Sequence, residues 1–240
     1  MNEVYSSIGK TYNGEKAIIS LTSWKARINT VSKTLYSLLQ QCPGFHIVLV
    51  LSEEEFPQKE KELPENLMLF IENDIIELLW VYKNYKSFKK VLFTMDKYRD
   101  VPVISADDGQ MYTENFAEKL YTIWQKNKNC IISNTQFKIK DVYFGCGARG
   151  ILYAPNCLEN AITFLTNDII KTNHDDMYIG ILAKINHIPW YFINKLNYRK
   201  NNFKVFKNDE KVGLTYNKMY NDSAYNKIYT SIKNIIQSYK

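Results

Sequence analysis

Two pairs of neighbouring aspartates are the residues of this sequence best suited to chemistry. Asp107 and Asp108 directly follow an apolar run, and Asp175 and Asp176 stand where a helical pattern begins. Such carboxylates can bind a Mg²⁺ or Mn²⁺ ion that bridges a nucleotide diphosphate, and they can accept a proton from a hydroxyl group. Each pair also has a purely structural explanation, because Asp-Gly favours turns and acids favour the first turn of a helix.

Basic residues and histidines give weaker signals. Two basic segments can each face a phosphate. One is a basic stretch from residue 195 to 207, and the other is a group of four lysines that precedes the first aspartate pair: Lys83, Lys86, Lys89 and Lys90. A row of lysines is more often a solvated helix face, and a single histidine such as His174 more often satisfies a local hydrogen bond than binds metal. The cysteines form no CxxC pair, which predicts free thiols in a reducing cytosol; they are Cys42, Cys130, Cys146 and Cys157.

The elements that must position these residues follow from composition and periodicity. The chain has 240 residues, 45% of them hydrophobic, with 31 basic against 25 acidic side chains, which excludes a disordered or disulfide-stapled protein. Apolar runs alternate with stretches of helical period, and this predicts a mainly parallel α/β sheet. The expected strands cover 17–21, 46–51, 75–81, 101–106, 130–132, 142–144 and 188–193. The expected helices begin after Asn29 or Thr30, run through 88–95, begin near Thr113, and cover 158–165 and 175–185.

The strand that ends before Asp107 places the first pair where open α/β sheets bind ligands. Residues 145–150 hold three of the nine glycines, which predicts a loop with positive φ or with close approach to another group. This loop lacks the strand-to-helix context of a dinucleotide fingerprint or a P-loop, and no zinc-hydrolase, serine-hydrolase or kinase signature is present.

The ends of the chain give expectations about location. The first residues contain no apolar signal-peptide core, and no apolar run is long enough to cross a bilayer, so we expect a cytoplasmic protein. From residue 195 the composition shifts to Lys, Asn and Tyr, and a helical pattern begins near Ser223. We expect this helix to pack on its own domain, with peripheral contact to the inner membrane as the alternative. No nucleic-acid recognition motif is present.

Several short motifs occur in a characteristic order. They read ISLTS at 19–23 followed by RI at 27–28, LVLSEEEFP at 49–57, YKSFKK at 85–90, ADD at 106–108 with Tyr112, GARGILYAP at 147–155 and HDD at 174–176. In this order they resemble a bacterial family of GT-A type glycosyltransferases that act in surface polysaccharide, capsule or lipooligosaccharide synthesis. The resemblance extends from about Ile18 to about Leu182.

The resemblance implies a GT-A fold, with a single Rossmann-like and mainly parallel sheet flanked by helices in residues 1–194, and a basic C-terminal arm in 195–240. It implies a nucleotide-sugar donor, UDP-linked, and a hydroxyl of a glycan or lipid-linked acceptor. The implied donor contacts are Thr22, Ser23, Arg27, Lys89, Lys90 and Asp107. The implied metal ligands for Mn²⁺ or Mg²⁺ are Asp107 and Asp108, with His174 as a further option. The acceptor loop is Gly147, Arg149 and Gly150, and the catalytic base is Asp176 or Asp175.

One position departs from the pattern of that family. The family usually has three consecutive acids after its fourth strand, and the third position here is Gly109. Three explanations stay open: Asp108 takes over as metal ligand, the enzyme works without metal through Lys89, Lys90 or Arg149, or the chain is a noncatalytic glycan- or nucleotide-binding relative. A sugar-phosphate nucleotidyltransferase is less consistent with the sequence, because the turn at 22–27 contains no glycine.

Overall fold

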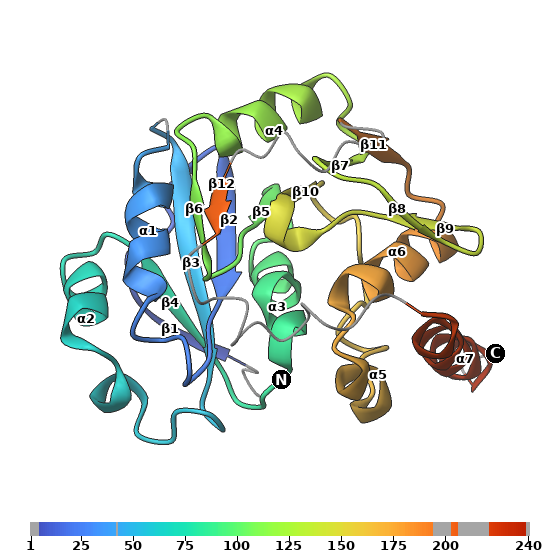
Figure 1. Cartoon of the computed structure of the whole chain (residues 1–240), viewed down its shortest axis with the longest axis horizontal. Helices are drawn as coiled ribbons and strands as arrows, with labels where there is room; N and C mark the ends of the chain where they lie inside the picture. Colours follow the sequence, from blue (N-terminus) through green and yellow to red (C-terminus); the bar gives the residue numbers. More distant parts are fainter. Residues whose placement is uncertain (1–4, 42, 194–202, 206–220, 239–240) are drawn as a thin grey trace.

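An eight-stranded sheet lies between two layers of helices in the computed structural model, which describes residues 5–41, 43–193, 203–205 and 221–238 (Figure 1). In spatial order its strands are β1 (Tyr5–Gly9), β4 (Glu77–Val81), β3 (Phe45–Ser52), β2 (Ala17–Thr22), β5 (Val103–Ser105), β10 (Ile151–Tyr153), β7 (Ile131–Ser133) and β11 (Trp190–Phe192). The four strands from β4 to β5 are parallel, as are β7 and β11, whereas β1 and β10 run antiparallel to their neighbours. The predicted mainly parallel sheet is therefore confirmed.

Alternating side chains of the strands point into two separate hydrophobic cores, one on each face of the sheet. On one face Ile19, Leu49 and Ile104 pack with α1 (Val31–Leu39), α2 (Glu65–Glu72) and α4 (Phe116–Gln125). On the other face Ile18 and Val48 pack with α3 (Lys89–Lys97), α5 (Asn167–Thr172), α6 (Asp175–Ile185) and α7 (Asp222–Ser238). Because successive residues of a strand point to opposite faces, a strand buried on both faces needs a continuous apolar run.

Two small sheets complete the described fold. The strands β8 (Phe137–Ile139) and β9 (Val142–Phe144) form a hairpin, and β12 (Phe203–Val205) pairs with β6 (Gln110–Tyr112). The sequence predicts residues 136–141 to be a polar segment between strands, whereas half of this segment is β8. The arm from residue 195 is expected to be peripheral, yet residues 203–205 pair with the strand that directly follows the first aspartate pair.

One predicted helix and one predicted cap are wrong. Residues 158–165 have helical spacing but form a series of turns, because Asn160 adopts a left-handed conformation with φ of 63° and interrupts the helical hydrogen bonds. The cap of α4 is Asn115 instead of Thr113, and the side chain of Gln41 accepts a hydrogen bond from the Ala117 N–H at 3.0 Å. Thr30 does stand at the cap position of α1, although its side chain makes no capping hydrogen bond.

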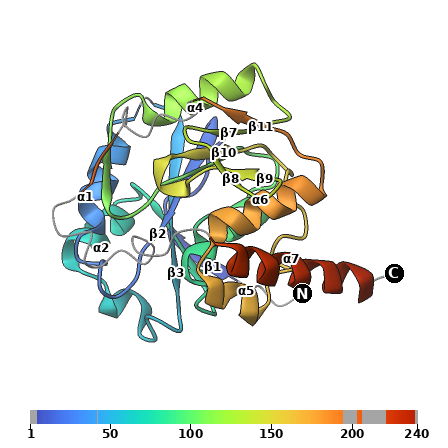
Figure 2. The ribbon, with the colours of Figure 1, turned by 45° about the vertical axis from the view of Figure 1, so that its right-hand side comes forward.

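The C-terminal helix α7 lies along α5 and α6 (Figure 2). Its apolar stripe is buried in the second core, with Tyr225, Ile228 and Ile232 all less than a tenth exposed. The expected packing on its own domain is therefore confirmed, and membrane contact stays a prediction. Three cysteines, Cys130, Cys146 and Cys157, are free thiols. The boundary at residue 194, Cys42 and the basic residues Lys195, Arg199, Lys200 and Lys207 lie outside the described residues.

Candidate active site

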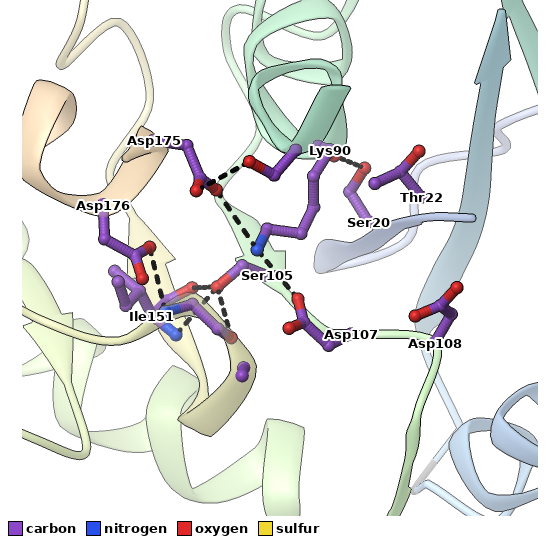
Figure 3. A network of polar contacts seen from close by, with 12 residues as sticks. Ser20, Thr22, Lys90, Ser105, Asp107, Asp108, Ile151, Asp175 and Asp176 are labelled. Carbon is purple, nitrogen blue, oxygen red and sulfur yellow. Dashed lines mark hydrogen bonds and ion pairs between the residues drawn. The ribbon is translucent and has the colours of Figure 1, made fainter. Parts of the chain in front are cut away.

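The carboxyl ends of the parallel strands form one edge of the sheet, and the predicted functional residues gather there. The parallel strands β2 and β5 end at Thr22 and Ser105, and two residues after β5 the chain reaches Asp107. Because β10 is antiparallel to β5, it begins at this edge, and the turn of residues 147–149 immediately precedes it. Helix α6 begins at the same place with Asp175, so four separate segments meet here (Figure 3).

The ammonium group of Lys90 lies at the centre of the predicted acids. Its Nζ donates a hydrogen bond to Asp107 Oδ1 at 2.8 Å and lies 3.4 Å from Asp175 Oδ2. Burial disfavours the charged form, but the carboxylates of Asp107, Asp175 and Asp176 outweigh it and raise the pKa of Lys90 well above its ordinary value. Lys90 therefore stays a cation, although its side chain is only 5% exposed.

Hydrogen bonds fix the orientation of the second aspartate pair. Asp175 Oδ1 accepts from the Ser87 hydroxyl at 2.9 Å, and Asp176 Oδ1 accepts from the Gly147 N–H at 3.0 Å. Burial, together with the charges of Asp175 and Asp107, raises the pKa of Asp176 to about 7, against the opposing effect of Lys90. A carboxylate with this pKa is suited to accept a proton near neutral pH.

The glycine turn is packed against these charged groups. A Cβ atom on Gly147 would lie 2.8 Å from Lys90 Nζ and 3.0 Å from Asp176 Oδ1. Gly150 has a φ of +91°, and a Cβ atom there would lie 2.5 Å from the ring of Phe116. The prediction that this loop needs positive φ or close approach is confirmed at both glycines.

Two side chains hold the glycine turn in place. The Ser105 hydroxyl donates to the Gly147 carbonyl at 3.1 Å and accepts from the Ile151 N–H at 3.1 Å. The Tyr112 hydroxyl accepts from the Asp107 N–H at 2.8 Å and donates to the Ala148 carbonyl at 3.2 Å. Tyr112 therefore joins the first aspartate pair directly to the glycine turn.

Asp108 points away from this cluster (Figure 3). One of its oxygens accepts from the Ser23 hydroxyl at 2.6 Å and the other from Arg27 at 2.7 Å. Burial raises the pKa of Asp108, and Arg27 and Ser23 oppose that rise. Ser23 and Arg27, which were predicted to contact the donor, thus bind Asp108, which was predicted to bind metal. The Thr34 hydroxyl donates to the backbone carbonyl of Asp108 at 2.9 Å.

The other predicted site residues have partners within the chain. Lys89 is buried and donates to Glu55 Oε2 at 3.0 Å; burial lowers its pKa, and Glu55 opposes this. The Thr22 hydroxyl donates to the Val50 carbonyl at 2.7 Å. His174 is buried directly before α6, and the Arg149 carbonyl accepts from the Asn134 side chain at 2.9 Å.

This arrangement does not fit a divalent ion held jointly by Asp107 and Asp108. Asp107 is bound to Lys90, and both oxygens of Asp108 are bound to Ser23 and Arg27. In the part of the chain that the structure describes, no three His, Cys, Asp or Glu residues are placed to hold a metal ion.

Several residues that shape the site were not singled out from the sequence. Ser105 does give a signal in the sequence, because it is a polar residue in an otherwise apolar buried strand. The Ser20 hydroxyl, which donates to the Lys90 carbonyl and lies 2.7 Å from the Thr94 hydroxyl, ties β2 to α3. A buried hydroxyl in a strand is therefore an informative feature, because it must find a partner.

Comparison with solved structures identifies the fold. The chain superposes on the crystal structure of S. aureus TarS with a TM-score of 0.53 and 10% identity, over 82% of this chain and 38% of TarS. The glycosyltransferase GlyE of Streptococcus pneumoniae TIGR4 matches with a TM-score of 0.45 and 14% identity, over 75% of this chain and 46% of GlyE. No protein-family model and no curated protein sequence matches the chain. The chain has the GT-A-like fold that the resemblance of its motifs implies.

The chain spans less than half the length of both of these proteins. At such low identity the likeness concerns the fold, and the activity has to be argued from the site. Within the described residues, each helix is too short or too polar to cross a bilayer.

Proposed function

We propose that the chain is a glycosyltransferase. It moves a sugar from a nucleotide-sugar donor, UDP-linked, to a hydroxyl group of a glycan or lipid-linked acceptor in the synthesis of cell-surface polysaccharide. The observation that carries this proposal is the orientation of Asp176, whose carboxylate is fixed by the Gly147 N–H at the carboxyl edge of a GT-A-like sheet and has a pKa of about 7. Ligands of open α/β sheets bind at this edge.

The proposed reaction is a single displacement. Asp176 accepts the proton of the acceptor hydroxyl, the acceptor oxygen forms a bond to the anomeric carbon, and the bond from that carbon to the diphosphate oxygen breaks. The diphosphate leaves with the electron pair, so the configuration at the anomeric carbon is inverted. Asp107, whose side chain is 34% exposed, is the acid of the cluster that a donor can reach most easily.

Release of nucleoside diphosphate from a panel of nucleotide sugars tests the proposal. We expect Asp176→Asn to lower turnover by about 10²–10⁴-fold, the usual effect of removing a general base. Asp175→Asn is expected to have a smaller effect, because this residue contacts Ser87 and Lys90 instead of the acceptor. Asp168→Asn, which changes an exposed aspartate on α5, is the matched control. Full turnover in both Asp176→Asn and Asp175→Asn would contradict the proposal.

The noncatalytic alternative is favoured by one observation, the full occupation of both Asp108 oxygens by Ser23 and Arg27. Under this alternative the chain binds nucleotide or glycan without transferring a sugar. Nucleoside diphosphates that raise the melting temperature, without any turnover of the corresponding nucleotide sugars, would favour it.

A further inference from the structure

The position of Lys90 resembles that of a bound cation. Its ammonium lies 2.8 Å from an Asp107 oxygen and 3.4 Å from an Asp175 oxygen, and these acids come from two different segments. Gly147 leaves room for the ammonium, because a Cβ atom there would lie 2.8 Å from Nζ. Buried carboxylates of like charge need a positive partner, and the chain supplies it from the first turn of α3.

We propose that Lys90 is a built-in cation that takes the place of a divalent metal ion, so that this site works without metal. The part of this inference that concerns the donor rests on the proposed function; the part that concerns the cation does not. Mn²⁺ has to compete with the ammonium for these carboxylates, because Asp107 Oδ1 and Asp175 Oδ2 already lie 2.8 Å and 3.4 Å from Nζ. Lys90 is also anchored at its backbone, where its carbonyl accepts from Ser20.

The geometry has a direct consequence for a variant without the ammonium. With Lys90 in place, no three of the described acids are arranged around one ion. In Lys90→Ala the carboxylates of Asp107, Asp175 and Asp176 lose the cation that offsets their charge, and we expect them to rotate towards an added divalent ion. Hard carboxylate oxygens on several sides are the ligand set that Mn²⁺ and Mg²⁺ prefer. Removal of one lysine is therefore expected to create a metal site.

Thermal unfolding of the chelator-treated full chain, with and without added MnCl₂, tests this inference. We expect no effect of Mn²⁺ on the wild-type melting temperature and a rise in Lys90→Ala of about 3–6 °C at a tenfold excess over the dissociation constant. Lys89→Ala is the matched control, because it removes the adjacent buried ammonium, which is hydrogen bonded to the carboxylate of Glu55 and to the carbonyl of Lys86. We expect no Mn²⁺ effect in this control or in the double variant Lys90→Ala, Asp175→Asn.

Two outcomes would overturn the inference. One is a clear Mn²⁺-dependent rise in the wild-type melting temperature, and the other is a folded Lys90→Ala variant that does not respond to Mn²⁺. If Lys90→Ala does not fold, Lys90→Gln replaces it, because the amide can still donate to Asp107 without carrying charge and its oxygen can serve as a metal ligand. We expect the melting temperature of Lys90→Gln to rise with Mn²⁺ as in Lys90→Ala. A folded Lys90→Gln variant that does not respond to Mn²⁺ would also overturn the inference.

A second arm separates this inference from the proposed function. Wild-type protein is titrated with UDP and with nucleotide sugars in the presence of chelator, and we expect the same affinity as with Mn²⁺. A large loss of nucleotide affinity in the presence of chelator would contradict the inference that the site works without metal. If no nucleotide binds under either condition, the proposed function fails, whereas the role of Lys90 as a cation is still decided by the response to Mn²⁺.

Discussion

Replacement of Asp176 by Asn is expected to stabilise the protein above neutral pH while it removes the proposed activity. Burial and the neighbouring acids raise the pKa of Asp176 from 3.8 to about 7. The folded chain therefore binds this proton more tightly than the unfolded chain does. The stabilising effect of the bound proton is fully present below pH 4 and is lost as the pH rises through about 7.

The size of the effect follows from the shift. Raising the pKa of Asp176 from 3.8 to about 7 corresponds to a ceiling of about 4 kcal/mol in the free energy of unfolding above pH 8. Asparagine carries no charge at any pH, and its oxygen can still accept from the Gly147 N–H. The variant should therefore be more stable than wild type at pH 8, and the difference should shrink steadily towards pH 4.

Urea denaturation at a series of pH values between 4 and 9 measures this difference. The control is Asp168→Asn, which changes an exposed acid and should change the free energy of unfolding only slightly. A wild-type protein that is more stable than Asp176→Asn at pH 8 would refute the reasoning. That result would mean that the negative charge of Asp176 is needed to hold Lys90 in place.

Three further predictions concern other parts of the structure. Gly147→Ala crowds the ammonium and the carboxylate beside it, and it should cost about 1–3 kcal/mol in urea denaturation and abolish nucleotide-dependent stabilisation in a thermal-shift assay. Arg27→Met leaves the buried carboxylate of Asp108 without its ion-pair partner and should lower the free energy of unfolding by about 3–5 kcal/mol. The control is Arg99→Met, which removes an exposed ion pair and should lower it by less than about 1 kcal/mol. Equal losses in the two variants would contradict the burial of the first pair. Ile228→Ala should cost about 2–5 kcal/mol if α7 packs on the domain, and Tyr229→Ala, on the exposed side, should cost much less in the same denaturation experiment.

The sequence predicts the central strands well, because a strand buried on both faces requires a continuous apolar run. The short edge strand β1 has no fully buried residue and only one aliphatic side chain, that of Ile8. Strand β10 has three residues that closely follow the glycine motif, so neither strand has a recognisable pattern. The turns at 158–165 show the limit of periodicity. Their apolar residues recur at helical spacing, but Asn160 adopts a left-handed conformation, which asparagine tolerates better than most residues.

The sequence predicted some of the residues that lie together at this edge of the sheet, but not their pairings. Asp107, Asp176, Lys90 and Gly147 do lie together, because all of them belong to segments that meet at the carboxyl edge of the sheet. The orientation of Asp108 could not be predicted. It depends on an ion pair with a residue 81 positions earlier in the chain, and a local sequence pattern does not reveal such a distant partner.

Hydrogen bonds from Ser105 restrict the motion of the glycine turn as strongly as that of a core strand. Its hydroxyl bonds to the backbone on both sides of the turn, and Ser105 itself belongs to a strand that is paired on both edges. The turn therefore cannot open without breaking hydrogen bonds at the centre of the sheet. Amide hydrogens at Gly147 and Ile151 should exchange with solvent only when this part of the sheet unfolds, at rates typical of core strands and not of surface loops. The backbone donor that orients Asp176 is thus as persistent as the fold itself.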